Sequence, residues 1–148
     1  MNILAILQNQ WFHNPERVRE TLKRHPQSRR RVIAYALFAG CKTGRVLKSV
    51  FGEELCHEIV WEEASPEIGS KASACFPANS AHLRVVLERV KPDLVLAFGK
   101  IAAHGLAPLV PAEKLLIGPH PTARGMQTIG RLREIAAQLR ERLKHAEA

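Results

Sequence analysis

The sequence predicts an α/β protein, a three-layer αβα sandwich built around a central four-stranded parallel sheet. Short apolar runs that suit buried strands alternate along the chain with amphipathic segments that suit helices, and this order favours a parallel sheet covered by helices on both faces. The chain has 148 residues, of which 46% are hydrophobic. That length suits one domain with a substantial core, so residues 1–148 are treated as a single domain.

The first strand is predicted over Ile3–Leu7, an apolar run that stops abruptly at the polar and aromatic segment 8–13. A helix from Pro15 to about Arg24 should follow, because Asn14 is a favoured helix cap and proline is favoured at the first helical position. The same short apolar runs predict the remaining strands at residues 57–61, 94–98 and 115–117. One further helix is predicted over residues 46–51 and ends at Gly52, and another is capped by Asn79-Ser80 and halts before Pro92. A short helix should follow Gly99 and run through Leu106, and a final helix is predicted from about Gln127 to His145.

Two further segments connect these elements. Residues 32–39 are apolar and break at Gly40, which begins a glycine-punctuated turn. Residues 67–77 have the small and polar composition of a loop.

The net charge of +8, from 22 Lys and Arg against 14 Asp and Glu, makes nucleic acid the leading partner, because a basic domain attracts polyanions at long range. Basic proteins that bind no nucleic acid are also common, so the charge supports this partner without identifying it. The apolar runs are far shorter than the roughly 18 to 20 residues that cross a bilayer, and the amino terminus lacks the pattern of a signal peptide. We therefore expect a cytoplasmic protein with no membrane partner.

The three cysteines, Cys41, Cys56 and Cys75, are widely spaced and form no C-x-x-C pair. Neither a disulfide nor a four-cysteine metal or cluster site is expected from this spacing. We predict reduced thiols, with no metal and no cofactor.

Loops at the carboxyl ends of parallel strands line the ligand crevice of such sheets. This rule gathers residues 9–13, 61–63, 98–100 and 120–122 at one edge of the predicted sheet. We expect the functional site at this edge.

Two motifs stand at this edge: Gln8-Asn9-Gln10-Trp11-Phe12 after the first strand and His120-Pro121-Thr122 after the last. In order and placement they resemble the uracil-DNA glycosylase superfamily, in which G-Q-D-P-Y-H or G-I-N-P-G follows an early strand and H-P-S follows a late one. Phe38-Ala39-Gly40, with Gly44 and Leu47, is similar to the P-F-V-G-x-x-G segment of the iron-sulfur branch, and residues 91–103 look like its strand-turn-helix before the H-P motif. The resemblance spans residues 3 to about 123.

The resemblance implies a monomeric, monofunctional DNA glycosylase of DNA repair that acts on duplex or single-stranded DNA. The target base would be flipped out of the stack into the crevice. His120 would donate a hydrogen bond to a base carbonyl as negative charge develops there. Asn9 would hold the attacking water through its carbonyl oxygen, orienting the water without deprotonating it, because an amide is not a useful proton acceptor.

Further residues are assigned by the same resemblance and by their residue types. Base- or substrate-binding residues are predicted at Gln8, Gln10, Trp11, Phe38, Glu62 and Glu63. DNA-binding residues are predicted at Lys42, Arg45, Lys100 and Arg124, and Arg124 or Met126 would fill the gap left by a flipped base. Phe38 either stacks on the base or belongs to the core, and Trp11 and Phe12 have the same two alternatives. His13 is a second-choice site residue, the other histidines are expected at the surface, and the run Arg29 to Arg31 is interpreted as a solvated face.

The chain departs from the family pattern around the first motif. Gln10 stands where a proline normally follows the acid or amide, and Leu7 and Trp11 replace neighbouring glycines. The cluster-binding cysteines of the iron-sulfur branch are also absent.

A further departure lies on the second strand, where that branch has an asparagine that recognises uracil. Here Val60 or Trp61 stands at that place and is followed by Glu62 and Glu63. The glutamates are either a solvated strand end or acceptors for an exocyclic amino group, as carboxylates are for cytosine. In the second case the preferred base is amino-bearing or modified, because a carboxylate would repel the O4 of uracil.

Two other functions fit the sequence. The first is a catalytically inactive glycosylase-fold protein that binds DNA or a modified base. The second is a nucleotide-handling enzyme on a similar three-layer fold, which is disfavoured because neither G-x-G-x-x-G nor G-x-x-x-x-G-K-S/T occurs.

Overall fold

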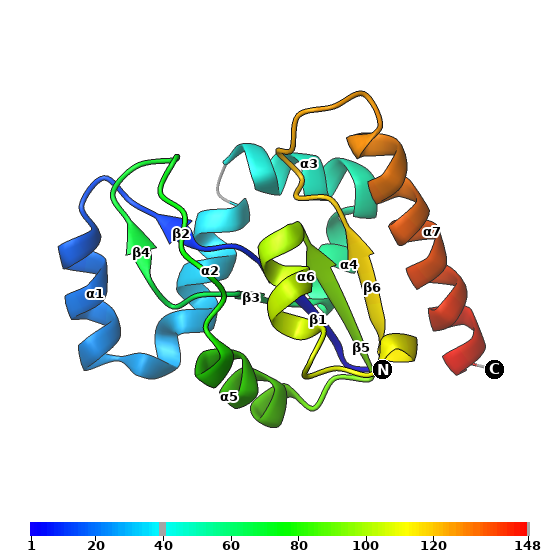
Figure 1. Cartoon of the computed structure of the whole chain (residues 1–148), viewed down its shortest axis with the longest axis horizontal. Helices are drawn as coiled ribbons and strands as arrows, with labels where there is room; N and C mark the ends of the chain where they lie inside the picture. Colours follow the sequence, from blue (N-terminus) through cyan, green and yellow to red (C-terminus); the bar gives the residue numbers. More distant parts are fainter. Residues whose placement is uncertain (39–40, 148) are drawn as a thin grey trace.

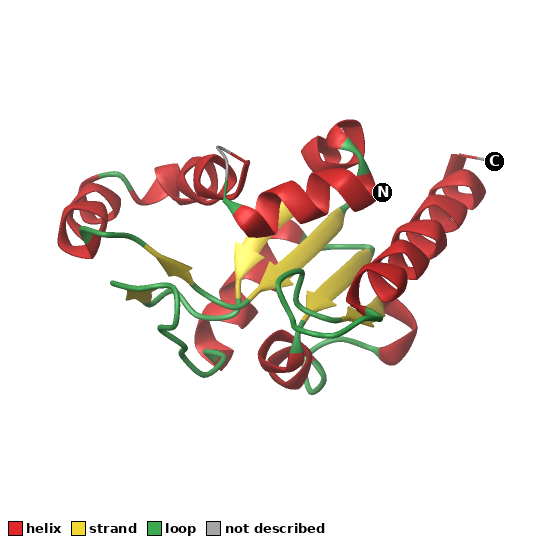
Figure 2. Cartoon of the chain, turned by 90° about the horizontal axis from the view of Figure 1, so that it is seen from above, coloured by secondary structure: helices red, strands yellow, loops and turns green. Residues whose placement is uncertain are grey.

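The computed structural model describes residues 1–38 and 41–147 and contains a four-stranded sheet in which all strands are parallel. The strand order is β3-β1-β5-β6, and the strands are β1 (Ile3–Leu7), β3 (Val60–Glu63), β5 (Leu94–Phe98) and β6 (Leu115–Gly118). Helices lie on both faces of the sheet (Figures 1 and 2). The predicted three-layer αβα sandwich is therefore confirmed.

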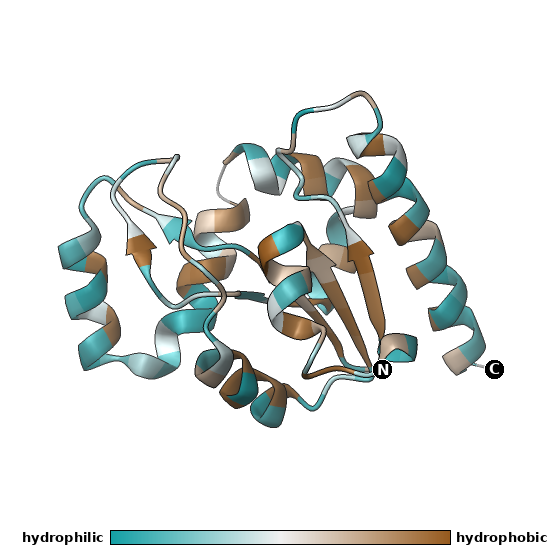
Figure 3. Ribbon diagram, in the orientation of Figure 1, coloured by the Kyte–Doolittle hydropathy of each residue, from teal (hydrophilic) through white to brown (hydrophobic). Residues whose placement is uncertain are grey.

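The two faces of the sheet pack against different sets of helices. One face is covered by α2 (Arg29–Phe38), α3 (Lys42–Phe51), α4 (Glu53–Glu58) and α7 (Thr128–Glu147). The other is covered by α5 (Ser80–Val90) and α6 (Lys100–Leu106). Side chains along β1 alternate between these two cores, so each position of the strand is buried and apolar. Figure 3 shows the contrast between the mostly hydrophobic residues of β6 and the mostly hydrophilic residues of the outlying α1 (Pro15–Arg24).

A second, two-stranded sheet lies beside α1, away from the main sheet (Figure 1). It pairs β2 (Gln10–Trp11) with β4 (Ile68–Gly69) in parallel, and Arg19 donates to the carbonyl of Ile68 at 2.7 Å. Gly69 is required there, because a Cβ on it would lie 2.3 Å from the Cβ of Ala74. Residues 67–77 were predicted as a loop, and this is wrong for β4, whose two residues are too few for a detectable period.

Most predicted boundaries are confirmed. The strands at 3–7 and 94–98 agree, as do the helix caps Asn14 and Asn79, whose side-chain oxygens accept from Arg17 N at 3.4 Å and His82 N at 2.9 Å. Short 3₁₀ turns, Pro26–Ser28 and Ala112–Lys114, complete the chain.

Two boundaries are corrected. The second strand, predicted at 57–61, begins at Val60, because residues 53–58 form α4 after Gly52, whose φ of 83° ends α3. The apolar segment 32–39 belongs to α2 as far as Phe38, and the predicted break at Ala39 and Gly40 lies outside the described residues. Gly44 lies inside α3, where a Cβ would come within 1.5 Å of the Leu37 carbonyl oxygen.

The strand order fixes where a ligand crevice forms. From β1 the chain passes to β3 on one side and then returns to β5 on the other side of β1. Crevices in parallel sheets form where neighbouring strands send their connections in opposite directions, here at the carboxyl ends of β1 and β5. Among the helices in the described part of the chain, none has the length and apolar character needed to cross a membrane.

Candidate active site

A cavity of about 800 Å³ opens at this edge, lined by the segment after β1, the end of α2, the start of α3 and the turn after β6. It brings together both predicted catalytic residues, Asn9 and His120. Other predicted site residues also line it, namely Gln8, Gln10, Trp11, Phe12, His13, Lys42 and Glu63. Segments at opposite ends of the sequence therefore share one cavity.

The side chain of Asn9 is held in one orientation. Its Nδ2 donates to the carbonyl oxygens of Gln10, at 3.1 Å, and Ala74, at 3.2 Å. Carbonyl oxygens only accept, so the nitrogen must face them and Oδ1 must face the other way. Oδ1 is buried and has no hydrogen-bond partner in the described chain. An unpaired buried acceptor costs about 1–3 kcal/mol, so this oxygen is a candidate for accepting a hydrogen bond from a ligand or water.

The ring of His120 is also fixed by its neighbours. Its Nδ1 lies 3.2 Å from the backbone nitrogen of Thr122 and 2.9 Å from the Thr122 hydroxyl. The backbone N–H can only donate, so Nδ1 accepts and the neutral ring carries its proton on Nε2. Burial lowers the pKa of His120, which keeps the ring neutral at neutral pH. The Nε2–H is therefore a hydrogen-bond donor for the cavity.

Gly99, at the end of β5, allows His120 to lie here. Its φ is 98°, and its N–H donates to the carbonyl of Gly118 at 2.9 Å. A Cβ on Gly99 would lie 3.2 Å from the Cβ of His120. Both the backbone conformation and the close approach of the two turns require glycine.

Glu63 is the last residue of β3 and is 4% exposed, and its buried Oε2 has no hydrogen-bond partner among the described residues. Burial, together with the negative charge of Glu62, raises the pKa of Glu63 to about 8, although Arg29 acts in the opposite direction. Glu63 is therefore mainly neutral at pH 7. The hypothesis that Glu63 accepts a hydrogen bond from an exocyclic amino group assumed an ionised carboxylate. The fold favours the protonated carboxyl group instead.

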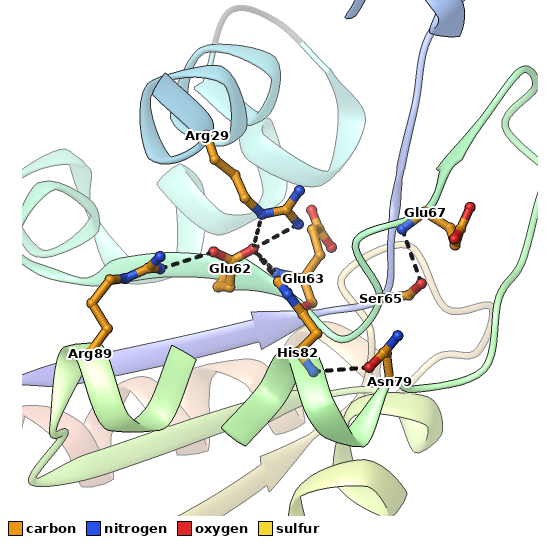
Figure 4. Close-up of polar contacts among 8 residues, drawn as sticks. All are labelled: Arg29, Glu62, Glu63, Ser65, Glu67, Asn79, His82 and Arg89. Carbon is orange, nitrogen blue, oxygen red and sulfur yellow. Dashed lines mark hydrogen bonds and ion pairs between the residues drawn. The ribbon is translucent and has the colours of Figure 1, made fainter. Parts of the chain in front are cut away.

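Glu62 is completely buried and is held by cations (Figure 4). Its carboxylate lies 2.9 Å from Arg29, 3.4 Å from Arg89 and 3.5 Å from His82, and it accepts from the backbone N–H of Glu63 at 3.0 Å. Burial alone would raise the pKa of Glu62, but His82, Arg29 and the Glu63 N–H outweigh it and lower the pKa to about 2. Glu62 is thus an anion that ties β3 to α2 and α5.

Three sequence interpretations are corrected by this arrangement. The two glutamates are not a solvated strand end, because both are buried. Arg29 does not belong to a solvated face, although Arg30 and Arg31 are exposed. His82 is not a surface residue, since its side chain is only 14% exposed. These contacts join residues far apart in the sequence, so no local sequence pattern predicts them.

Several predicted site residues lie outside the cavity lining. Phe38 packs edge-on against Trp61, with ring centroids 5.6 Å apart, and adjoins the core. Arg45, Lys100 and Arg124 are exposed, and Lys100 borders a separate shallow hollow beside α6. Glu62 does not line the cavity either.

Other cavity residues were not predicted. Tyr35 of α2 is 75% exposed and lines the cavity. Thr122 orients His120, and the backbone of Ala74 orients Asn9. Tyr35 was not predicted as a site residue because the apolar segment 32–39 was not recognised as part of a helix.

Metal ligands do not gather in the described part of the chain, where no three His, Cys, Asp or Glu side chains are placed to hold an ion. Cys41, Cys56 and Cys75 are free thiols. The chemistry available to the cavity is that of amide, imidazole, carboxyl, ammonium and aromatic groups. The chain matches no protein-family model and no curated protein, so its function is argued from this geometry.

Proposed function

We propose that the chain is a DNA glycosylase of the uracil-DNA glycosylase superfamily, which acts in DNA repair by hydrolysing the N-glycosidic bond of a flipped base. One observation carries the proposal. Asn9 and His120, from motifs at opposite ends of the chain, line the same cavity, and in the described chain Asn9 has an unpaired acceptor, Oδ1, while the tautomer of His120 leaves Nε2–H as a donor.

His120 acts on the departing base. As the glycosidic bond lengthens, negative charge develops on the base, and the Nε2–H donates to a base carbonyl where that charge gathers. A preorganised donor of this kind lowers the barrier by about 3 to 4 kcal/mol. The ring keeps its proton throughout, because its neutral form is the donor.

Asn9 acts on the water. Its Oδ1 accepts a hydrogen bond from a water molecule and orients it toward the sugar carbon. The amide does not remove a proton, so attack follows substantial departure of the base, through a sugar-cation-like transition state. The water oxygen bonds to the sugar carbon, the carbon–nitrogen bond breaks, and one proton of the water is released to solvent.

Residues at the cavity support binding of DNA. Lys42 supplies a positive charge at the start of α3, and the exposed rings of Trp11 and Tyr35 offer faces on which bases can stack.

The test is a cleavage panel. Wild-type protein is incubated with duplex and single-stranded oligonucleotides bearing uracil, hypoxanthine, mismatched or modified bases, and abasic sites are measured. We expect His120→Ala to slow product formation about 10²- to 10³-fold, Asn9→Ala to reduce it strongly, and His57→Ala, at an exposed histidine of α4, to leave it unchanged. Absence of abasic product from the whole panel would reject the glycosylase activity.

A catalytically inactive DNA- or modified-base-binding protein is the second candidate. It is favoured by the charge state of Glu63, which is the only acid among the described cavity residues and is mainly neutral at pH 7. No carboxylate is thus available there to activate water. Salt-sensitive binding that depends on the base, without abasic product, would support this function instead.

A further inference from the structure

Glu63 is the one carboxyl group among the described residues that line the cavity, and its Oε2 is buried with no hydrogen-bond partner in the described chain. We infer that Glu63 meets the flipped base as a neutral carboxylic acid and donates its proton in a hydrogen bond to a ring carbonyl, so that the site takes lactam bases such as uracil or hypoxanthine. This inference rests on the proposed function, because it assumes that a base enters the cavity. It replaces the expectation of an amino-bearing base.

The neighbouring contacts explain why Glu63 is neutral. Arg29 of α2 directs both Nε and a terminal nitrogen at Glu62, and Arg89 and His82 of α5 also lie on the Glu62 carboxylate. The nearby cations are therefore committed to Glu62, whose negative charge opposes ionisation of Glu63.

The groups that share the cavity with Glu63 do not change this conclusion. Lys42, His13 and His120 line the same cavity, but none of them forms an ion pair with Glu63 in the described chain. A second buried carboxylate without a cation is strongly unfavourable, so the proton stays on Glu63.

A neutral carboxyl offers one O–H donor beside one carbonyl acceptor. A lactam edge offers a carbonyl oxygen beside an N–H, so the two groups pair through two hydrogen bonds. During glycosidic cleavage the lactam oxygen gains negative charge, and a donor facing it becomes stronger. An acceptor facing an amino group would gain nothing as the base becomes an anion. The neutral acid therefore suits the departure of a lactam base.

The test measures binding without cleavage. Fluorescence anisotropy is recorded at constant salt with duplexes that carry a single 2′-fluoro-2′-deoxyuridine or 2′-fluoro-2′-deoxycytidine, which resist hydrolysis. Three variants accompany the wild type. Glu63→Gln keeps a donor beside an acceptor but cannot ionise, Glu63→Leu has neither group, and Glu67→Gln removes the same charge at an exposed residue nearby.

We expect the wild type, Glu67→Gln and Glu63→Gln to prefer the uridine duplex, and Glu63→Leu to bind it at least about tenfold more weakly. Between pH 7 and pH 9 the neutral fraction of a group with a pKa of about 8 falls from about nine-tenths to about one-tenth. The affinity of the wild type should fall about tenfold over that range relative to Glu63→Gln. Titration of the uracil itself affects both proteins equally and so cancels in the comparison.

Three results would overturn the inference while leaving the glycosylase proposal in place. The first is a preference of the wild type for the cytidine duplex. The second is a loss of affinity for the uridine duplex that is as large in Glu63→Gln as in Glu63→Leu. The third is a wild-type affinity that depends on pH in the same way as that of Glu63→Gln. Absence of base-dependent binding and of cleavage in the wild type would reject both.

A measurement without DNA gives an independent check. The carboxyl carbon of Glu63 is followed by ¹³C NMR as pH is raised, with the Glu63→Gln spectrum identifying its signal. We expect it to titrate near pH 8, and titration near pH 4 would overturn the inference even if Glu63→Leu fails to fold.

Discussion

Glu62 and Glu63 are adjacent and buried, yet their charge states differ because their partners differ. Because β3 is at the edge of the sheet, Glu62 contacts cations from α2 on one face and from α5 on the other, whereas Glu63 lines the cavity. The first carboxyl is ionised with its pKa lowered to about 2, and the second is mainly neutral at pH 7 with its pKa raised to about 8. Glu62 ties β3 to α2 and α5, and Glu63 keeps an unpaired carboxyl oxygen in the described chain.

Glu62→Gln should lower the free energy of unfolding by about 3 kcal/mol, because Arg29, whose side chain is 18% exposed, would stay buried without its anion. Urea denaturation at pH 7 measures this change. Glu67→Gln, at an exposed residue, is the control and should change stability by less than about 0.5 kcal/mol. Equal effects of the two substitutions would mean that the ion-pair cluster contributes nothing to stability.

The raised pKa of Glu63 should make the free energy of unfolding fall as pH rises, whereas an ion-paired acid makes it rise. Its pKa is raised from the ordinary value of 4.5 to about 8 in the fold, so between these values the folded chain binds more protons than the unfolded chain. The free energy of unfolding therefore falls as pH rises from about 5 to 8, by up to about 1.4 kcal/mol per pH unit, relative to Glu63→Gln. Urea titrations of both proteins at pH 5, 6, 7 and 8 measure the difference, and a constant difference would contradict the raised pKa.

At the scale of elements, the turns after β5 and β6 approach each other only because Gly99 has no side chain. Gly99→Ala would strain a φ of 98° and push its Cβ against His120. We expect a loss of about 1–2 kcal/mol of stability and a fall in any activity that depends on His120. Thermal unfolding and the cleavage panel measure the two effects.

Gly130→Ala is the matched control within α7. Nothing lies within 4 Å of a Cβ at that position, and alanine favours the helix. This substitution should raise stability by about 0.5–1 kcal/mol. If both substitutions stabilise the protein, the close approach of Gly99 to His120 is not a constraint.

Elements that carry their own local signal are the ones that the sequence predicts. Continuous apolar runs identify β1 and β5, and Asn14 and Asn79 mark helix starts, because these preferences depend on adjacent residues alone. The sequence also predicts that Asn9 and His120 lie at the same edge of the sheet, since both residues follow parallel strands, and both line the cavity.

What the sequence does not predict depends on contacts between distant segments. The charge state of Glu63 requires knowing that Arg29, His82 and Arg89 are all committed to Glu62. The anchoring of Asn9 likewise depends on a carbonyl at Ala74, 65 positions away. Such contacts are set by the tertiary fold and leave no periodic pattern in the chain.

At the scale of the whole molecule, the net charge of +8 bears on DNA binding. If phosphates are the partners, affinity for an undamaged duplex should fall at least about tenfold between 50 and 200 mM NaCl, which corresponds to about two or more phosphate contacts. Anisotropy titrations across this range give the slope of log affinity against log salt. A flat profile would mean that the excess charge has no nucleic-acid partner.

The position of the charge can be tested separately from its amount. Lys42 lines the cavity, whereas Lys144 is exposed near the end of α7. Lys42→Gln should reduce the slope of log affinity against log salt by about 1, because one phosphate contact is lost. Lys144→Gln should leave this slope unchanged. Both variants lower the net charge equally, so only a local contact distinguishes them. Equal changes in the two would mean that DNA responds to the overall field of the protein, without a phosphate held at the cavity.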